Sequence, residues 1–465
     1  MQLYDIKKHI PEQELDTIKY LVDVFIKNGF QCYLIGGSVR DLIIGHRCND
    51  YDFATNARPD EILRLFQRVI PTGIKHGTVT VIINDISFEI TTYRSDGKYI
   101  NGRHPDTVTF SKTLKEDVVR RDFTINGLAY DIVKDEIIDY VNGMEDIDKK
   151  IVRTIDDPMK RFSEDGLRTF RACRLASKLG FIIEEKTFFA ISQTLDVARK
   201  VSVERIRDEL VKILQISVPS VGIEYLRKCG LLTIVLPELA SSYEIYQNKY
   251  HVHDIYYHSI YSCDSAPLEH PSIRLAALLH DIGKVPTKKL GEGGDYTFYN
   301  HEVVGAKMAR GIMKRLKFSN EEIERVNNLV LNHMFHYTDE WTDGAVRRFM
   351  RKVGTENIND MFLLRLADRK GNGSREGMPE PIKKLIRRIG KIIEEENAIS
   401  LKDLKINGHM LMEKFNMKPG PKIGRILNEL LEVVLDDPDK NESETLCLMA
   451  GEIIDRTRSE QDQVY

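Results

Sequence analysis

The first 150 residues of the chain combine short apolar runs with segments of helical spacing. The run 32–35, Cys-Tyr-Leu-Ile, predicts a buried strand, and the runs 78–83 and 87–92 are rich in the β-branched residues typical of strands. Residues 59–68 have the pattern of a short helix. This mixture predicts an α/β head.

After Pro158 the apolar residues recur at about every third or fourth position, which is the period of an amphipathic helix. The residues that set this pattern at its start are Phe162, Leu167, Phe170, Cys173, Leu175 and Leu179. Gly180 is expected to end the first helix, because glycine readily takes the left-handed conformation of a C-terminal cap. We therefore predict an α+β protein whose remaining two thirds are almost entirely helical.

Four parts are expected along the chain. They are an α/β head at 1–150, a helical neck at 151–215, a helical body at 216–375 and a helical C-terminal region at 376–465. Polar, glycine-bearing stretches at 95–106 and 371–381 are expected to interrupt the fold as loops.

Length, charge and cysteine usage narrow the class of protein. With 465 residues, 42% of them hydrophobic, the chain can bury several ordinary cores. Its net charge of -3 means that any contact with nucleic acid must come from a local basic patch. The six cysteines form no CxxC pair, the N-terminus lacks an apolar signal core, and no apolar stretch reaches the roughly 18 residues of a membrane span. We therefore expect reduced thiols and a cytoplasmic protein.

The most informative segment is 36–41, Gly-Gly-Ser-Val-Arg-Asp, directly after the first predicted strand. Its glycines allow backbone N–H groups to approach an anion, and a helix expected at 38–44 presents its positive end to the same turn. We therefore predict that Gly37, Ser38 and Arg40 bind the phosphates of a nucleotide.

Two carboxylates follow at Asp50 and Asp52, and on an extended strand both project from one face. Such a pair is suited to a shared divalent cation, and magnesium with phosphate oxygens in its shell is the expected occupant. Glu89, on a neighbouring predicted strand, is a further carboxylate for this site, although a surface acid on a strand explains it about equally well.

These residues resemble the head of the class II tRNA nucleotidyltransferase and poly(A) polymerase family. Further family motifs follow in order at 89–94 (Glu-Ile-Thr-Thr-Tyr-Arg), 120–126 (Arg-Arg-Asp-Phe-Thr-Ile-Asn), 161–168 (Arg-Phe-Ser-Glu-Asp-Gly-Leu-Arg) and 204–209 (Glu-Arg-Ile-Arg-Asp-Glu). The resemblance implies transfer of a nucleotide to the 3'-hydroxyl of tRNA, with Arg121, Asp122 and Asn126 contacting the triphosphate and ribose. Taken alone, the arginine pair would fit a solvated charged face.

Asp165 and Arg168 are the predicted readers of the base. On one helix they share a face, and a carboxylate only accepts hydrogen bonds whereas a guanidinium only donates them. Cytosine and adenine both present an amino donor beside an unprotonated ring nitrogen, while uracil and guanine present the reverse order. The pair would therefore select C and A, as the resemblance also implies, unless it is an ordinary helix salt bridge. The motif at 204–209 is predicted to support neighbouring helices and to have no catalytic role.

A second group of metal-ligand residues lies in the helical region and resembles an HD domain. Its signature is the run 278–284, Leu-Leu-His-Asp-Ile-Gly-Lys, and its predicted ligands are His258, His280, Asp281, His301, His333 and Asp368. Mixed imidazole and carboxylate ligands suit magnesium, manganese, nickel, iron or zinc, so the metal is left open. The chemistry expected from this site is hydrolysis of phosphoesters.

The function predicted from these features is addition of C, C and A to the 3' end of tRNA from CTP and ATP, with Mg2+ in the head and a second, metal-dependent phosphohydrolase activity in the HD domain. Alternatives within the family are a poly(A) polymerase and enzymes that add only C or only A. From another class, the chain could be an HD phosphohydrolase whose head senses nucleotides. The basic helix expected at 383–391 is a candidate tRNA contact, or equally a solvated face.

Overall fold

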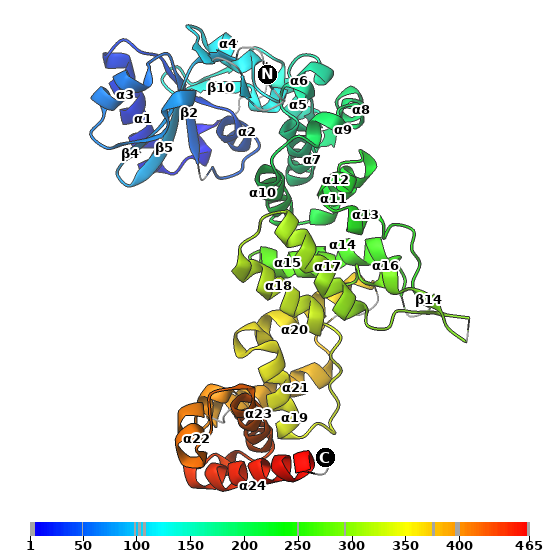
Figure 1. Cartoon of the computed structure of the whole chain (residues 1–465). Helices are drawn as coiled ribbons and strands as arrows, with labels where there is room; N and C mark the ends of the chain where they lie inside the picture. The colour runs from blue at the N-terminus through cyan, green and yellow to red at the C-terminus, as the bar shows by residue number, and fades with distance from the viewer. Residues whose placement is uncertain are drawn as a thin grey trace. The chain divides into compact units, whose positions relative to one another are not determined.

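The computed structural model describes residues 5–48, 50–96, 99–100, 104–105, 108–248, 251–292, 294–373, 377–395 and 400–462. The chain divides into two units, Met1–Ala240 with Arg315–Lys317 and Ser241–Lys314 with Phe318–Tyr465. The order of the elements confirms the predicted fold class, an α/β region followed by a mainly helical remainder (Figure 1).

A seven-stranded sheet forms the centre of the head, with the strand order β11-β10-β1-β2-β5-β4-β3. Its strands are β1 (Cys32–Ile35), β2 (Tyr51–Thr55), β3 (Val69–Gly73), β4 (Thr78–Ile83), β5 (Ile86–Thr92), β10 (Leu128–Asp131) and β11 (Glu136–Asp139). Every neighbouring pair is antiparallel except β2 and β5, which run parallel. The predicted strands at 32–35, 78–83 and 87–92 are confirmed, the last with Ile86 added at its start.

Three helices accompany this sheet, α1 (Glu12–Lys27), α2 (Gly37–Ile43) and α3 (Pro59–Leu65). The turn from β1 into α2 requires glycine at position 36, because Gly36 has φ 79° and ψ -136°. The helix expected at 38–44 is thus present one residue earlier. The helix expected at 59–68 is shorter than predicted, since β3 already begins at Val69.

The polar stretch 95–106 was expected to be a loop, and this is wrong for the part that the structure describes. Short antiparallel pairs form there between β6 (Arg94–Asp96) and β9 (Val108–Phe110), and between β7 (Tyr99–Ile100) and β8 (His104–Pro105). Residues 97–98, 101–103 and 106 of the stretch lie outside the described residues.

The rest of the first unit is mainly helical. Its helices are α4 (Leu114–Val119), η3 (Thr124–Asn126), α5 (Gly143–Asp148), α6 (Pro158–Glu164), α7 (Leu167–Leu179), α8 (Glu185–Gln193), α9 (Leu195–Ala198), α10 (Val203–Leu214), α11 (Pro219–Lys228), α12 (Leu232–Val235) and α13 (Pro237–Ala240). Gly180 ends α7 with φ 65°, as predicted. The helix is interrupted between α6 and α7. At this interruption a Cβ on Gly166 would lie 2.6 Å from the carbonyl oxygen of Val197.

The second unit consists mainly of helices. They are α14 (Ile255–Ser265), α15 (Pro271–Leu279), α16 (Lys284–Thr287), α17 (His301–Arg315), α18 (Asn320–Asn332), α19 (Asp343–Val353), α20 (Ile358–Gly371), α21 (Glu380–Glu394), α22 (Gly408–Phe415), α23 (Pro421–Asp436) and α24 (Ser443–Asp462). The interruption predicted at 371–381 separates α20 from α21, and residues 374–376 of it lie outside the described residues.

Two glycines allow close packing where the helices of this unit meet. A Cβ on Gly283 would lie 2.1 Å from the carbonyl oxygen of His301, so the turn after α15 packs directly on the start of α17. A Cβ on Gly371 would lie 2.2 Å from Ser262 Oγ, where α20 meets α14. Both contacts involve elements that carry predicted metal ligands.

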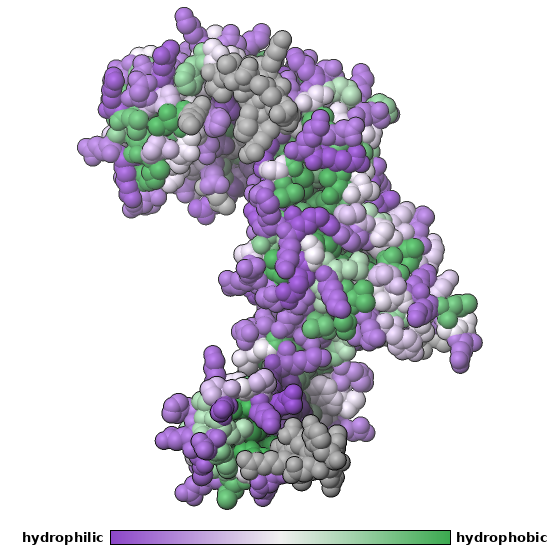
Figure 2. Space-filling model, viewed as in Figure 1, coloured by the Kyte–Doolittle hydropathy of each residue, from purple (hydrophilic) through white to green (hydrophobic). Residues whose placement is uncertain are grey.

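The last three helices share their own apolar core. Its fully buried residues are Leu411, Leu430, Leu431, Val434, Leu435, Leu446 and Ala450. On the face viewed in Figure 2, hydrophilic side chains cover most of the described surface and apolar ones form separate groups. In the described part of the chain, no helix has both the length and the apolar character needed to cross a bilayer.

Candidate active site and metal centre

Asp52 and Glu89 face each other across the parallel strands β2 and β5, where they are direct partners in the register. Asp50 precedes β2 by one residue and is exposed. Ser38 holds this segment in place, since its Oγ donates to the carbonyl oxygen of Asp50 at 2.9 Å and accepts from the N–H of Asp52 at 3.1 Å. The structure thus places Asp50 and Asp52 beside Ser38, in the first turn of α2, and Glu89 beside Asp52.

Negative charge at this position is only partly compensated. Burial, then Glu89, raises the pKa of Asp52 to about 6, while Arg121 acts in the opposite direction. A carboxylate with this environment favours binding of a cation. Among the described residues the three head acids do not form a ready cluster of metal ligands. The facing carboxylates of Asp52 and Glu89 fit magnesium, because this ion is commonly bound by one or two carboxylates together with substrate phosphates and water.

Arg121 lies against the glycine turn, because a Cβ on Gly36 would be only 3.0 Å from its Nη1. Its Nη2 and the Nη2 of Arg120 contact opposite oxygens of the buried Asp117, at 3.1 and 2.6 Å. Burial alone would raise the pKa of Asp117, but the two arginines lower it. The ion pairs hold the Arg121 guanidinium beside the turn predicted to receive phosphates.

A hydrogen-bonded chain links α2 to α7 through the predicted nucleotide-binding residues. The buried Arg40 donates to Asn126 Oδ1 and to Asp41, and Asn126 Nδ2 donates to Asp122 Oδ1 at 3.1 Å. Arg171 donates to Asp122 Oδ2 at 2.7 Å. Burial would raise the pKa of Asp122, yet Arg171 and Asn126 lower it to about 2. Gly37 packs beside the Arg40 guanidinium, with its Cβ position 3.4 Å from Nη2.

Asp165 and Arg168 do not share a helix, so that part of the prediction is wrong. Asp165 lies in the break after α6, where its carboxylate accepts from the N–H of Leu167 at 3.0 Å and from Arg205 Nη2 at 2.8 Å. Arg168, in the first turn of α7, donates to Glu164 at 2.5 Å and to the carbonyl oxygen of Arg161 at 2.9 Å. The charged partner of Asp165 is therefore Arg205, from the motif predicted only to buttress helices.

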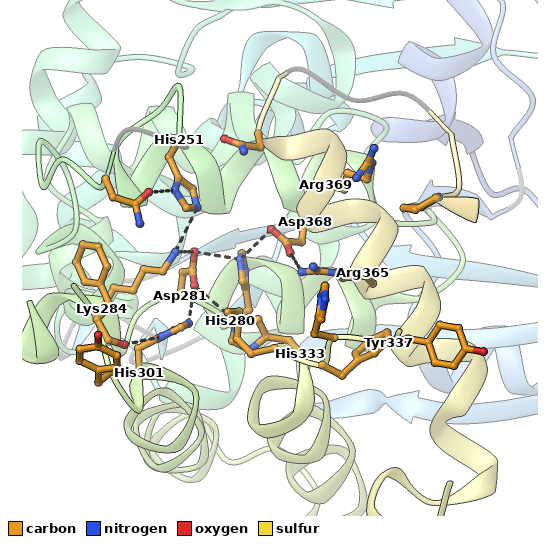
Figure 3. Close-up of a pocket in the computed structure, with 18 of the residues that line it drawn as sticks. His251, His280, Asp281, Lys284, His301, His333, Tyr337, Arg365, Asp368 and Arg369 are labelled. Atoms are coloured by element: carbon orange, nitrogen blue, oxygen red, sulfur yellow. Dashed lines mark hydrogen bonds and ion pairs between the residues drawn. The ribbon is translucent and has the colours of Figure 1, made fainter. Parts of the chain in front are cut away.

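The six ligands predicted in the helical region converge on one centre. Figure 3 labels five of them, His280, Asp281, His301, His333 and Asp368. They come from α14 (His258), the end of α15 (His280 and Asp281), the start of α17 (His301), the end of α18 (His333) and α20 (Asp368). We refer to these six residues as the His-Asp cluster. The Nε2 atoms of His258 and His280 are 3.1 Å apart, and Asp281 Oδ2 lies 3.2 Å from His280 Nε2.

Backbone carbonyls fix the orientation of three imidazoles in this cluster. The Nδ1 atoms of His280, His301 and His333 lie 2.7, 2.8 and 2.7 Å from the carbonyl oxygens of residues 277, 298 and 330. Each Nδ1 therefore carries the proton and donates, which leaves a lone pair on Nε2 for a metal. Burial would raise the pKa of Asp281, but His280 and Lys284 hold it well below its ordinary value. The donor set fits a divalent cation.

Comparison with known proteins assigns the family. The Poly A polymerase head domain matches residues 32–153, the RNA and SrmB-binding site of polymerase A matches 180–243, and tRNA nucleotidyltransferase domain 2 matches 299–450. The CCA-adding enzyme of Enterococcus faecalis is 32% identical over 426 residues, which cover 91% of this chain and 92% of that enzyme. The chain belongs to the family of CCA-adding enzymes, which are nucleotidyltransferases.

Two further relatives show how the similarity is distributed. The CCA-adding enzyme of Lactobacillus helveticus is 49% identical over 203 residues, which cover 42% of this chain and about half, 51%, of that enzyme. The crystal structure of the Bacillus stearothermophilus CCA-adding enzyme in complex with CTP matches with a TM-score of 0.72 at 25% identity, over 96% of this chain and 99% of that chain.

In this member of the CCA-adding family, the predicted basic helix α21 has its cations paired within the chain. Lys384 contacts Asp339 at 2.7 Å, Arg387 contacts Glu380 at 2.9 Å, and Arg388 contacts Asp343 at 2.5 Å. Ion pairs leave less uncompensated charge for phosphates, which favours the alternative of a solvated face.

The sequence prediction gave no role in either site to several residues around the two centres. In the head they are Arg171 and Arg205, and around the His-Asp cluster they are His251, Lys284, Arg365 and Arg369. The last four line a cavity of about 730 Å³ together with Tyr296, Tyr299 and Tyr337. Lys284 Nζ donates to Asp281 Oδ2 at 2.6 Å, and Arg365 Nη1 donates to Asp368 Oδ2 at 2.9 Å. The position of Lys284, three residues after Asp281, is the signal that could have identified it.

Proposed function

We propose that this chain adds C, C and A in turn to the 3' end of tRNA, using CTP and ATP with Mg2+. The observation that carries the proposal is the pairing of Asp52 with Glu89 across β2 and β5, beside the glycine turn that holds Arg121. Two carboxylates of this kind can hold a divalent metal, and the guanidinium beside the turn is a cation suited to phosphate. The family assignment supports the same reaction.

In this reaction the 3'-hydroxyl oxygen of the RNA forms a bond to the α-phosphorus of the nucleotide. The bond from that phosphorus to the bridging oxygen breaks, pyrophosphate leaves, and the hydroxyl proton passes to water. Mg2+ bound there would supply activation of the hydroxyl and neutralisation of the leaving phosphates. Asp50, Asp52 and Glu89 would hold the metal, and Arg121 would bind the triphosphate.

Base selection is assigned to Asp165, held by Arg205, and to Arg168. The Asp165 carboxylate would accept from the amino group that cytosine and adenine share, and it would repel the carbonyl of uracil or guanine. Arg205 orients the carboxylate. The Watson–Crick edge is read by the protein alone, so no nucleic-acid template is needed.

The direct test is incubation of the purified protein with tRNA that lacks its 3' CCA, with each nucleoside triphosphate alone and in combination. We expect two C residues from CTP alone and a single further A when ATP is added. Products of only C or only A would assign a partial CCA enzyme, and long A tails would assign a poly(A) polymerase. Absence of any addition would contradict the proposal.

A second activity, metal-dependent hydrolysis of phosphoesters, is supported by the His-Asp cluster. Its cavity is lined by Lys284, Arg365 and Arg369, which are cations suited to a phosphate group. Hydrolysis of a 2',3'-cyclic phosphate would join a water oxygen to phosphorus, break one bond to a ribose oxygen, and transfer the water proton to that oxygen. Such a reaction would help to clear blocked RNA ends.

The assay for this activity uses tRNA ending in a 2',3'-cyclic phosphate with Ni2+, Mn2+ or Mg2+. We expect ring opening with at least one of these metals, and no hydrolysis with any of them would contradict the second activity. Hydrolysis without nucleotide addition would instead favour the alternative of a phosphohydrolase with a nucleotide-sensing head.

The four-part division of the chain also remains our proposal, with the head at 1–150 for transfer, the neck at 151–215 for base recognition, the body at 216–375 for the HD domain, and 376–465 for tRNA binding. We also propose a cytoplasmic location. All six cysteines are free, buried thiols, which fits a reducing compartment.

A further inference from the structure

Two exposed tyrosines line the cavity beside the His-Asp cluster. Tyr296, in β15 (Tyr296–Thr297), is 38% exposed, and Tyr299 is 79% exposed. Phe298 between them is buried, so this segment keeps one aromatic ring in the fold and presents two outside it. Single exposed aromatic residues are common on proteins, but a pair that lines one cavity together with cations has the composition of a ligand-binding surface.

A hairpin holds the two tyrosines in place. β15 pairs with β14 (Lys289–Leu290) in antiparallel register, and the hairpin projects from the helices of the second unit (Figure 1). Tyr299 comes two residues before His301, so their Cα atoms lie within about 7 Å of each other. Asn300 makes the turn between them with φ 60°. An elongated ligand stacked on the Tyr299 ring can therefore extend to the His-Asp cluster.

Lys288 gives this surface a fixed positive charge. Its Nζ lies 3.7 Å from the centre of the Tyr296 ring and donates to the carbonyl oxygen of Tyr246 at 2.9 Å. The ammonium group therefore stays over the ring in a cation–π contact. No carboxylate in the described part of the chain pairs with Lys288, so its charge is available to an anion.

A second cation lines the cavity from α20. Arg365 and Arg369 lie about one helical turn apart on this helix, and both line the cavity (Figure 3). Arg365 donates to Asp368 at 2.9 Å, whereas the Nε of Arg369 is buried and has no hydrogen-bond partner among the described residues. A buried N–H without a partner costs free energy, and a phosphate oxygen would offset that cost.

We propose that this surface binds the single-stranded 3' end of an RNA. We refer to its four members as the tyrosine rim: Lys288, Tyr296, Tyr299 and Arg369. Bases stack on the two tyrosines, and phosphates lie against the two cations. Exposed aromatic rings beside cations are the elements with which proteins bind single strands, because every base has a stacking face, which pairing in a duplex would cover.

The tyrosine rim serves the phosphohydrolase proposed above, on which this assignment rests, and gives it a substrate class, an unpaired RNA end and not a free phosphate ester. The RNA lies along the rim, and its terminal phosphate enters the cavity beside the His-Asp cluster. Stacking reads no base edge, so ends of different sequence are accepted. A protein partner would instead require a larger continuous apolar surface than two rings separated by charged groups.

The test measures binding and not catalysis. The full-length protein is titrated against a fluorescein-labelled ribotetranucleotide that ends in a 3'-phosphate, in chelator so that no metal-dependent hydrolysis occurs, and fluorescence anisotropy gives the affinity. Tyr299→Ala should weaken binding about tenfold or more, and Tyr299→Phe should retain it, because stacking needs the ring and not the hydroxyl. Arg369→Gln should weaken binding and lower its dependence on salt, because one phosphate contact is lost.

A tetranucleotide with abasic sites identifies the stacking contribution. It should bind the native protein about tenfold or more weakly than the tetranucleotide with bases, and Tyr299→Ala should not weaken it further. Tyr20→Ala is the matched control, because Tyr20 is a 55% exposed tyrosine of α1 in the other unit. This control should retain the native affinity for both probes.

Equal affinities of the native and Tyr299→Ala proteins for the tetranucleotide with bases would overturn the tyrosine rim, even where the cyclic phosphate is hydrolysed. Equal affinities of the native protein for the two probes would overturn it as well. Base-dependent binding through Tyr299 without any hydrolysis would support the rim and contradict the proposed phosphohydrolase, so the two failures are distinct.

Discussion

Arg205, and not Arg168, is the charged partner of Asp165, with Arg205 Nη2 2.8 Å and Nη1 3.2 Å from the two carboxylate oxygens. The residue predicted to read the base is therefore held by an arginine from a motif 40 positions later in the chain. This contact joins α10 to the break between α6 and α7, and it makes base selection dependent on both segments.

Asp165→Ala should lower incorporation of CTP and ATP together and relax discrimination against UTP and GTP. Arg205→Gln should do the same more weakly, because the carboxylate remains but loses its partner. An unpaired buried polar group costs about 1–3 kcal/mol, or about tenfold or more in kcat/KM. The measurement is single-nucleotide incorporation with each triphosphate.

The matched control for this pair is Arg199→Gln, which removes a surface ion pair with Asp196 in the same unit. It should leave incorporation unchanged. Loss of C addition with normal A addition in the Asp165→Ala protein would show that the two bases are not read by one carboxylate.

Asp52→Asn should abolish nucleotide addition and leave the fold intact, because it removes a ligand charge without changing the volume. Metal stabilisation of the transition state is worth several kcal/mol, so we expect a loss of at least about 100-fold. Single-turnover assays measure the loss, and circular dichroism checks the fold. Asp60→Asn, on the exposed face of α3, should retain full addition, and near-normal addition by Asp52→Asn would refute the head assignment.

The raised pKa of Asp52 predicts a pH-dependent effect on stability. Since the pKa is 3.8 ordinarily and about 6 in the folded protein, the folded state binds more protons in that window and loses stability as pH rises from 4 to 6. Above pH 6 and without Mg2+, Asp52→Asn should be more stable than the native protein by up to about 2–3 kcal/mol.

Thermal melts at pH 4 and pH 7 measure this difference, which should shrink toward pH 4. Added Mg2+ should stabilise the native protein more than Asp52→Asn, because the ion binds the charged carboxylate. Equal melting temperatures of the two proteins at pH 7 would mean that the pKa of Asp52 is not raised in the folded protein.

The two centres should fail independently, because they use different residues in different units. Replacing His280 and Asp281 by Ala should remove hydrolysis of the cyclic phosphate and preserve CCA addition. Asp52→Asn should have the opposite effect. The two assays run on both variants measure this, and loss of CCA addition in the folded double variant would show that the centres are coupled.

Gly283→Ala should disrupt the His-Asp cluster without touching a ligand. The added Cβ would lie 2.1 Å from the carbonyl oxygen of His301 and 2.5 Å from the N–H nitrogen of Gly305. We expect a loss of about 1–3 kcal/mol or more in stability and weaker Mn2+ binding. Gly311→Ala, on helix α17 against which Gly283 packs, has open space around it and should instead be neutral or stabilising.

Local features of the fold could be predicted from the sequence where a short segment contains the whole physical cause. The apolar run at 32–35 forms β1, and Gly180 ends α7 with a left-handed conformation. The length of the helix at 59–68 was overestimated, because pairing of β3 with β4 competes with the helix for the residues after Leu65.

The residue types of both centres were also predictable, because Asp50 and Asp52, and the His280-Asp281 pair, lie close together in the sequence. The six ligands of the His-Asp cluster do converge. What could not be predicted is which imidazole nitrogens lie beside each carboxylate oxygen of Asp281. That depends on the angles at which α14, α15, α17, α18 and α20 meet.

The sequence alone therefore determined the order of the elements and the chemical identity of the groups, because period, turn residues and motif spacing are properties of neighbouring positions. Only the tertiary structure decided the partners. Asp165 was predicted to act with Arg168, three residues away, but the extended backbone of Asp165 ends α6, and α7 begins only after Gly166, which packs on Val197. The carboxylate then turns to Arg205, because a charged group in a folded interior binds the cation that packing brings nearest.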